Sequence, residues 1–266
     1  MTSFAFTKMH GLGNDFVVIN ANKVNTPITP AMVRRMSDRH TGIGCDQVLI
    51  LGNGAAADTF KYTIYNSDGS SAEHCGNGAR CIARYVKENG LSTAKAVTFQ
   101  MASRAIHTHY HDDDQISVDM GAVSFDPEFE VIFKHETFTI MPVMLSNPHA
   151  ITIAPLDGDQ LIAMGEILNH HPRFPAGVNF SAIRIIDKHH IQLDVYERGA
   201  GITQACGSAA CAAAALGIKR GLLASPCTVT MPGGDCEIIC THENGPVILK
   251  GPAVRVFDGV WHDQQP

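Results

Sequence analysis

The sequence is poor in charged and aromatic residues, and it has no excess of basic charge. Asp, Glu, Lys and Arg make up 17% of the 266 residues, aromatic residues make up 7%, and tryptophan occurs once. The formal net charge is −6, with a pI near 6.1. Nucleic acids and anionic membranes bind basic surfaces, so this composition argues against both as partners.

Long hydrophobic runs are also missing. No apolar stretch approaches the roughly 20 residues that span a bilayer. Residues 1–8 lack a basic segment followed by an apolar one, so we expect no signal peptide. Eight cysteines in a chain that is not exported are expected to stay reduced, which predicts a cytoplasmic location.

Metal and nucleotide motifs are missing as well. The chain has no Cys-x-x-Cys pair, and Cys236 and Cys240 near His242 lack the second pair that a structural zinc site needs. Three histidines alternate over residues 107–111, and we interpret them as surface imidazoles. The glycine pair of residues 11–13 is too short for a phosphate loop. The sequence therefore predicts neither a metal site nor a phosphate-binding loop.

What the sequence does contain is an internal echo. The stretch that leads to Cys75 is repeated in the stretch that leads to Cys206. Each copy runs from a strand-like segment ending at a tyrosine, through a glycine-rich loop, to a Cys-Gly pair that opens a helix-like segment. Tyr65 matches Tyr196 at the same offset as the two cysteines, 131 residues (206 − 75). The echo predicts two similar domains, each contributing one cysteine.

The local patterns are rich in strands, with one apolar, small-faced helix central to each half. We expect a loop at residues 10–15 and a turn at residues 146–149. Helices are expected at residues 29–36, 76–89, 161–170 and 207–220. Strands are expected at residues 4–8, 16–20, 48–51, 60–65, 97–101, 105–110, 116–120, 137–145, 150–153, 178–186, 191–196, 228–231, 237–241, 247–250 and 254–257.

A cysteine at a helix N-terminus lies at the positive end of the helix dipole, beside unpaired backbone amides. Both favour the thiolate and predict a thiol pKa below the usual value of about 8.5. The glycine after each cysteine leaves those amides open to a carboxylate. Two such thiols suit inversion at an α-carbon, because one removes the proton as a thiolate and the other returns a proton to the opposite face.

A less specific interpretation competes with this one. A single cysteine before a helix is most often a small buried residue. Two in register, each followed by glycine and preceded by similar polar residues, favour catalysis instead. Cys81 and Cys211, which fall inside the expected helices, are interpreted as core residues.

Further motifs accompany the two Cys-Gly pairs. In chain order they are Met9-His-Gly-Leu-Gly-Asn14-Asp15-Phe16, Gly42-Ile-Gly-Cys45-Asp46-Gln47, Asn66-Ser-Asp-Gly69, Cys75-Gly-Asn-Gly-Ala-Arg80, Asn147-Pro-His149, and Glu197-Arg-Gly-Ala-Gly201 with Gln204-Ala-Cys206-Gly-Ser208. As a set they closely resemble the diaminopimelate epimerase family over essentially the whole chain.

The resemblance implies an α/β (α+β) fold of two pseudo-symmetric domains, each a rolled, mostly antiparallel sheet around a central helix. We expect one domain over residues 1–120, to which residues 253–266 return, and a second over residues 121–252. The family is cofactor-independent, cytoplasmic and commonly homodimeric. Its activity is the interconversion of LL- and meso-diaminopimelate for lysine and peptidoglycan synthesis.

The resemblance also implies roles for individual residues. Cys75 and Cys206 correspond to the acid–base pair. The reacting carboxylate is expected at the amides of Gly76, Asn77, Gly207 and Ser208. The remaining substrate-binding residues are expected to be Asn14, Gln47, Asn66, Asn147, Asn179, Glu197 and Arg198, with His149 in support.

Four positions depart from the family pattern. Cys45 stands where phenylalanine is usual, His74 where glutamine is usual, Ile202 where glutamate is expected and Ala209 where glycine is expected. Ala209 is predicted to stabilise its helix by up to about 1 kcal/mol over glycine. A protonated His74 would favour the Cys75 thiolate. These departures affect the details of substrate binding rather than the reaction class.

Three other functions remain open at this point. A proline-racemase-like enzyme could use the same two thiols, but a proline ring offers no distal carboxylate for Arg198 to bind. A redox switch could join Cys75 and Cys206 in a disulfide, but because oxidation would abolish activity we interpret it as a liability of the site and not as its purpose. A binding module without activity would leave the paired Cys-Gly helix starts unexplained.

Overall fold

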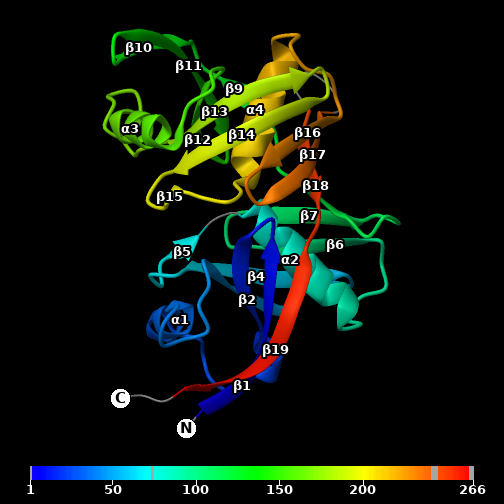
Figure 1. Ribbon diagram of the computed structural model, residues 1–266. Coiled ribbons are helices and arrows are strands. Elements are labelled where there is room, and N and C mark those ends of the chain that lie inside the picture. Colours follow the sequence, from blue (N-terminus) through cyan, green and yellow to red (C-terminus); the bar gives the residue numbers. More distant parts are fainter. Residues whose placement is uncertain (1, 73–74, 241–244, 264–266) are drawn as a thin grey trace. The chain divides into compact units, whose positions relative to one another are not determined.

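The computed structural model describes residues 2–72, 75–240 and 245–263 (Figure 1). The chain divides into two compact units, Met1–Val118 with Gly251–Pro266, and Asp119–Lys250. These divisions lie two residues from the domain boundaries expected from the sequence (120 − 118 and 252 − 250). That these units are the two domains expected from the sequence stays a prediction.

The first unit is a mostly antiparallel sheet. Its strands are β1 (Thr2–Gly11), β2 (Asn14–Asn20), β3 (Gln47–Asn53), β4 (Thr59–Asn66), β5 (Ser71–Ala72), β6 (Ala96–Gln100), β7 (Ala105–Tyr110), β8 (Ile116–Asp119) and β19 (Val254–Asp263). They pair in the order β19-β1-β2-β3-β4-β6-β7-β8, and only β2–β3 and β4–β6 are parallel among these pairs of described strands. The blue β1 and the red β19, from opposite ends of the chain, lie side by side (Figure 1).

Each parallel pair in the first unit is connected through a helix. A short 3-10 helix (Ala21–Lys23) and α1 (Pro30–Ser37) follow β2, and the Thr29 hydroxyl accepts a hydrogen bond from the Met32 amide at 3.3 Å, as the Thr-Pro signal predicts. The helix α2 (Gly76–Glu88) follows β4 and β5. Its small and apolar residues are buried against β1, β2 and β7, so it forms the centre of the unit.

The second unit is built in the same way. Its strands are β9 (Ser124–Phe125), β10 (Phe129–Phe133), β11 (Glu136–Leu145), β12 (Asn147–Thr152), β13 (Asn179–Asp187), β14 (His190–Glu197), β15 (Gly201–Ile202), β16 (Cys227–Met231), β17 (Gly234–Cys240) and β18 (Val247–Gly251). They pair in the order β10-β11-β12-β13-β14-β16-β17-β18. Again two pairs in this order, β12–β13 and β14–β16, are parallel among the described strands.

Helices connect the parallel strands of the second unit too. The helix α3 (Gly158–Asn169) begins with a capping box between Asp157 and Gln160. The helix α4 (Gly207–Lys219) is almost wholly buried and contacts strands β11 to β14, as well as β16 and β17. Its run of alanines permits that close packing on several sides. Both units therefore have the expected architecture, a sheet around one central helix.

Several local expectations from the sequence were wrong. The loop expected at residues 10–15 is a two-residue turn, in which Leu12 and Gly13 have φ of 56° and 82°. The turn expected at residues 146–149 is confined to Ser146, with φ of 62°, so β12 already begins at the next residue. The strand β10 and the two-residue strands β5, β9 and β15 were not anticipated. None of the helices in the described ranges is long and apolar enough to cross a membrane.

Candidate active site

Cys75 occupies the N-cap position of α2, where the sequence predicts it. Its extended backbone, with φ of −151°, turns the side chain back onto the first helical turn. The Gly78 amide donates a hydrogen bond to the Cys75 sulfur at 3.3 Å, and the thiol donates to the Asn14 Oδ1 at 3.6 Å. The side chain is half-buried. The sulfur therefore receives one backbone donor, and an amide oxygen faces its proton.

Cys206 occupies the same position at the start of α4 but in a different environment. Its side chain is buried, with 6% exposure, and its sulfur lies 3.5 Å from the Ser208 Oγ. Burial, followed by the negative charge of Glu197, raises the pKa of the Cys206 thiol well above its usual value. The expectation that the helix N-terminus lowers this pKa is therefore wrong for Cys206, because desolvation of the thiolate outweighs the nearby donors.

Asn14 and Asn77 form a contact beside Cys75. The turn at Leu12 brings Asn14 to the first position of β2, and the Asn77 Nδ2 donates to the Asn14 Oδ1 at 3.3 Å. Arg80, which is fully buried, donates to the Asn77 Oδ1 at 2.9 Å and to the Pro252 carbonyl at 3.1 Å. A buried guanidinium thus orients one of the residues expected at the reacting carboxylate.

Gln47 and Asn66 are brought together by the register of β3 and β4. They are paired directly, and the Gln47 Nε2 donates to the Asn66 Oδ1 at 2.9 Å. The Asn66 Nδ2 donates in turn to the Ser70 Oγ at 3.0 Å. The sequence separates these residues, but the antiparallel ladder places their amides in one chain of hydrogen bonds.

In the second unit, His149 and Asn147 stand on β12. His149 is buried, and its Nε2 lies 2.9 Å from the Asn147 Oδ1. Burial lowers the pKa of His149 to about 3, so the ring is neutral at pH 7. A neutral ring whose Nε2 faces an amide oxygen carries its proton on Nε2 and donates it. His149 therefore orients Asn147, which agrees with its expected supporting role.

The other expected residues of this unit lie at the ends of β13 and β14. The Arg198 amide donates to the Asn179 Oδ1 at 2.9 Å, and the Arg198 Nη1 donates to the Ala176 carbonyl at 2.7 Å. The Arg198 side chain is exposed. The Thr203 hydroxyl donates to the Glu197 Oε1 at 2.6 Å. The backbone of Arg198 therefore holds the Asn179 side chain, and the Arg198 guanidinium retains N–H donors for a ligand.

Sheet register makes the residues of the two units equivalent in pairs. Phe16 pairs with Gln47 in the parallel ladder of the first unit, and His149 pairs with Asn179 in that of the second. The equivalent pairs are Asn14 with Asn147, Gln47 with Asn179, Asn66 with Glu197, and Cys75 with Cys206. The fold therefore repeats one set of four positions, and every residue in the set was expected at the site.

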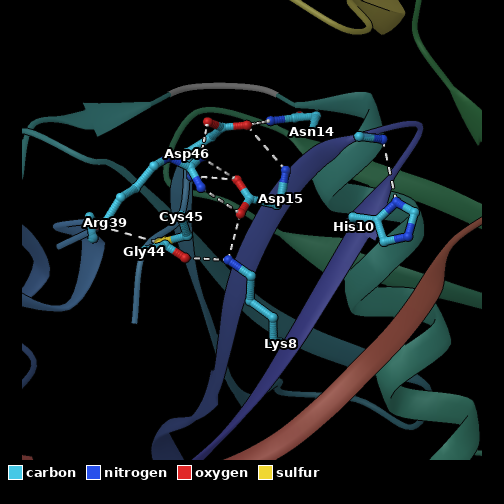
Figure 2. Close-up of polar contacts among 10 residues, drawn as sticks. Lys8, His10, Asn14, Asp15, Arg39, Gly44, Cys45 and Asp46 are labelled. Carbon is cyan, nitrogen blue, oxygen red and sulfur yellow. Dashed lines mark hydrogen bonds and ion pairs between the residues drawn. The ribbon is translucent and has the colours of Figure 1, made fainter. Parts of the chain in front are cut away.

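A cluster of charged residues that contacts the Asn14 side chain was not anticipated. Asp46 accepts hydrogen bonds at its Oδ2 from the Asn14 Nδ2, at 2.8 Å, and from the Asp15 amide, at 3.1 Å (Figure 2). Arg39 bridges Asp46 and Asp15, with 2.8 Å to each carboxylate, and Lys8 also contacts Asp15 (Figure 2). The one sequence signal for this cluster was the place of Asp46 beside Gln47 in a glycine-rich motif.

Three of the four departures from the family pattern fall within the described residues. Cys45 is buried in the core of the first unit, with its sulfur 3.4 Å from the Ser37 Oγ. Ile202 is 47% exposed, and Ala209 is fully buried within α4. His74 lies outside the described residues. Cys45 therefore serves core packing instead of lining a pocket.

No cluster of metal-binding side chains is found in the part of the chain that the structure describes. Carboxamides, backbone amides, thiols and one arginine dominate the candidate residues. Such groups bind an amino acid through its carboxylate and ammonium groups, and the thiols supply exchangeable protons.

Comparison with known proteins identifies relatives of this chain. A family model described as diaminopimelate epimerase matches residues 6–125 and 141–256. The chain is 43% identical to the diaminopimelate epimerase of Nitrosospira multiformis, over 96% of both chains. It is also 43% identical to that of Aromatoleum aromaticum, over 97% of this chain and 98% of the relative.

Solved structures of similar fold are more distant in sequence. A hydroxyproline epimerase from Agrobacterium vitis matches with a TM-score of 0.72 and 12% identity, over 98% of this chain and 93% of the other. A Bacillus anthracis protein of the PhzF family of phenazine biosynthesis matches with a TM-score of 0.77 and 13% identity, over 99% and 100%. At these identities the likeness establishes the fold alone.

Proposed function

The chain belongs to the diaminopimelate epimerase family, and we propose that it interconverts LL- and meso-diaminopimelate with Cys75 and Cys206 as the two acid–base groups. The enzyme is an isomerase of amino-acid biosynthesis, and its substrate is a small molecule. The observation that carries the catalytic assignment is the placement of both cysteines as N-caps of the two central helices, at equivalent positions of a repeated fold.

Inversion needs two protonic groups, because a single base would return the proton to the face it left. One cysteine acts as a thiolate and removes the α-proton, and the other donates its thiol proton to the opposite face. The roles exchange in the reverse direction. Burial raises the Cys206 pKa, so the protonated thiol, the form that donates a proton, is favoured at this cysteine.

Backbone amides at the two helix starts would bind the reacting carboxylate. Gly76, Asn77 and Gly207 are buried and Ser208 is half-buried, which brings their amides into a partly dry environment. As the α-carbon loses its proton, negative charge spreads onto the carboxylate, and fixed donors at a helix N-terminus stabilise that charge.

The distal amino-acid end would be recognised by the amide side chains and by Arg198. The guanidinium fork matches a carboxylate with two parallel hydrogen bonds. Asn66, Asn147 and Asn179 are each oriented by a neighbour, so they offer defined donors or acceptors to that end. Substrates without a second carboxylate, such as proline derivatives, would leave Arg198 unmatched.

Two broader properties belong to the same proposal. We infer a homodimer, because the family is commonly dimeric. We infer a cytoplasmic location, because the substrate is a precursor in lysine and peptidoglycan synthesis and because the chemistry requires reduced thiols.

The test is proton NMR of the purified, reduced protein with LL-diaminopimelate in heavy water. The α-proton signal is expected to disappear while the meso isomer forms. Both changes should be lost in Cys75→Ala and in Cys206→Ala, with a fall in rate of at least about 100-fold in each. Cys211→Ala, which removes a buried thiol inside α4, is the matched control and should retain turnover.

Two outcomes would contradict the proposal. Absence of exchange with either isomer, with the thiols shown to be reduced, would remove diaminopimelate as the substrate. Full activity in either single variant would remove the two-base assignment while leaving the substrate in place.

A further inference from the structure

The side-chain amide of Asn14 is held at both of its ends. Its Nδ2 donates to the Asp46 carboxylate at 2.8 Å. Its Oδ1 accepts from the Cys75 thiol at 3.6 Å and from the Asn77 Nδ2 at 3.3 Å. A flipped amide would place its oxygen against the carboxylate and its NH₂ against the NH₂ of Asn77. The orientation is therefore strongly specified.

Asp46 is in turn held by a charged guanidinium and by a backbone amide. Arg39 donates to the Asp46 Oδ1 at 2.8 Å, and the Asp15 amide donates to its Oδ2 at 3.1 Å (Figure 2). Burial works against the charge of Asp15, but hydrogen bonds from Arg39 and Lys8 outweigh it and lower the Asp15 pKa to about 2. The Asp46 and Arg39 side chains are 45% and 56% exposed, so their ion pair contributes little to the stability of the fold. Its effect is to fix the position of the Asp46 carboxylate.

We propose that Asp46 is a positioning residue that locks Asn14 with its oxygen toward the Cys75 sulfur. A fixed acceptor beside a sulfur stabilises the thiol and disfavours the thiolate. The network thereby shifts the equilibrium of Cys75 toward its protonated form, the form that donates a proton in the reaction proposed above. The catalytic meaning rests on that proposed function, but the effect on the thiol does not.

Two titratable groups in the described part of the chain near Cys75 do not supply this effect. Tyr62 on β4 and Cys81 within α2 are fully buried. Burial disfavours their charged forms and raises the pKa of each well above its usual value. Both are therefore neutral over the range in which a thiol titrates. The Gly78 amide donates to the sulfur and does not titrate. Residues 73 and 74 lie outside the described part of the chain.

The second unit holds its equivalent asparagine by the opposite end. His149 donates to the Asn147 Oδ1, whereas Asp46 accepts from the Asn14 Nδ2. The residue at the position of His149 in the first unit is Phe16, which offers no hydrogen bond to Asn14. Among the described residues, the carboxylate that holds Asn14 thus belongs to the Cys75 half, and an imidazole takes its place at Asn147.

The test is the pH dependence of Cys75 alkylation by iodoacetamide, followed by peptide mass spectrometry without substrate. In Asp46→Ala the Asn14 amide can rotate and turn its NH₂ to the thiolate. The midpoint of alkylation should then fall by about 0.5–1 pH unit relative to wild type. Cys240, half-buried in the other unit, is alkylated in the same sample and is the internal reference.

Two further variants separate positioning from general damage. Asp114→Asn removes another surface carboxylate that pairs with an arginine, at 2.6 Å from Arg84, and should leave the Cys75 midpoint unchanged. Arg39→Ala leaves the Asp46 carboxylate in place but loosens it, so a smaller fall is expected. If Asp46→Ala does not fold, Arg39→Ala decides the question.

The inference is overturned if the Asp46→Ala or Arg39→Ala midpoint equals that of Asp114→Asn, or if it rises. Failure of the proposed function would look different: diaminopimelate would show no α-proton exchange while the alkylation midpoint still moved. A shifted alkylation midpoint without α-proton exchange would support the effect of Asp46 on the Cys75 thiol and would contradict only its role in epimerisation.

Discussion

The two units share one topology and one set of side-chain positions, but they treat the equivalent asparagines in opposite ways. Asn14 begins β2 and Asn147 begins β12. A carboxylate holds the first by its nitrogen, and an imidazole holds the second by its oxygen. A repeated fold therefore duplicates where side chains stand, while the immediate neighbours decide what each one offers to a ligand.

The two cysteines show the same divergence. Cys75 is half-buried beside an amide oxygen, and Cys206 is buried beside the negative charge of Glu197. Glu197 occupies the register position that Asn66 holds in the first unit. One thiol acts on each face of the α-carbon, so the reaction does not require the two thiols to have the same surroundings.

The largest effect is expected where the first helical turns differ. A methyl group on Gly78 would lie 2.7 Å from the Tyr62 hydroxyl and 3.3 Å from a Leu49 methyl. Gly78→Ala should lower the free energy of unfolding by about 1–3 kcal/mol, measured by urea denaturation. The second unit accepts alanine here, at Ala209, and carries Leu193 at the position of Tyr62.

Adding Tyr62→Leu should therefore restore much of the stability lost in Gly78→Ala. The Tyr62 hydroxyl is buried without a hydrogen-bond partner among the described residues, so its removal costs little. If Gly78→Ala alone is as stable as wild type, the first unit also accommodates the methyl group. The two units would then not differ at this position.

The second effect concerns the free energy of unfolding at acidic pH. Burial lowers the His149 pKa to about 3 in the folded protein, below the unfolded value of about 6.5. As pH falls below 6.5, the unfolded chain binds a proton that the folded chain does not, so stability decreases down to about pH 3. At pH 5 this amounts to about 2 kcal/mol. Above pH 6.5 the contribution vanishes.

His149→Phe, which copies Phe16 of the first unit, removes this titration. Urea denaturation at pH 7 and pH 5 should show a smaller loss of stability in the variant than in wild type, by about 2 kcal/mol. Phe16→Leu, a change at the equivalent position without a titrating group, should show the same pH dependence as wild type. Equal pH dependence in all three proteins would contradict the low pKa of His149.

A third effect separates the thiols by reactivity. Because Cys206 is buried and its pKa is raised by burial and by Glu197, iodoacetamide at pH 8 should modify Cys75 about tenfold faster. Glu197→Gln removes the negative charge and should decrease the ratio of the Cys75 modification rate to the Cys206 modification rate. Peptide mass spectrometry gives both rates in one sample. Faster modification of Cys206 in wild type would reverse the comparison.

The smallest effect is expected at Ala209. Ala209→Gly restores the glycine of the family pattern inside α4, and it should cost up to about 1 kcal/mol of stability through helix propensity. Urea denaturation against Ala213→Gly, another fully buried alanine of the same helix, is the control. A gain of stability in Ala209→Gly would mean that its methyl group strains the packing.

Much of the secondary structure could be predicted because its signals are local. Thr29 and Pro30 mark the start of α1, and Gly90, with φ of 62°, follows the end of α2. The turn expected at residues 146–149 is shorter than predicted for a physical reason. Ser146 alone makes the reversal, and Pro148 sits inside a strand, paired with Met144.

The candidate site was predictable as a set of residues but not as a set of orientations. The motifs identified Asn14, Gln47 and the two cysteines. They did not identify Asp46, because its significance depends on Asn14 and Asp15, which lie 32 and 31 residues away and meet it only through the parallel pairing of β2 and β3.

The sequence by itself determined the family, the reaction and the two helix starts, because motif spacing, caps and glycine turns act within a few residues of one another. Only the tertiary structure decided which end of each amide is held and how far each thiol is removed from water. Those properties depend on hydrogen-bond partners and burial that the sheets assemble from distant parts of the chain, and the free energy of a buried or oriented group is set by that environment.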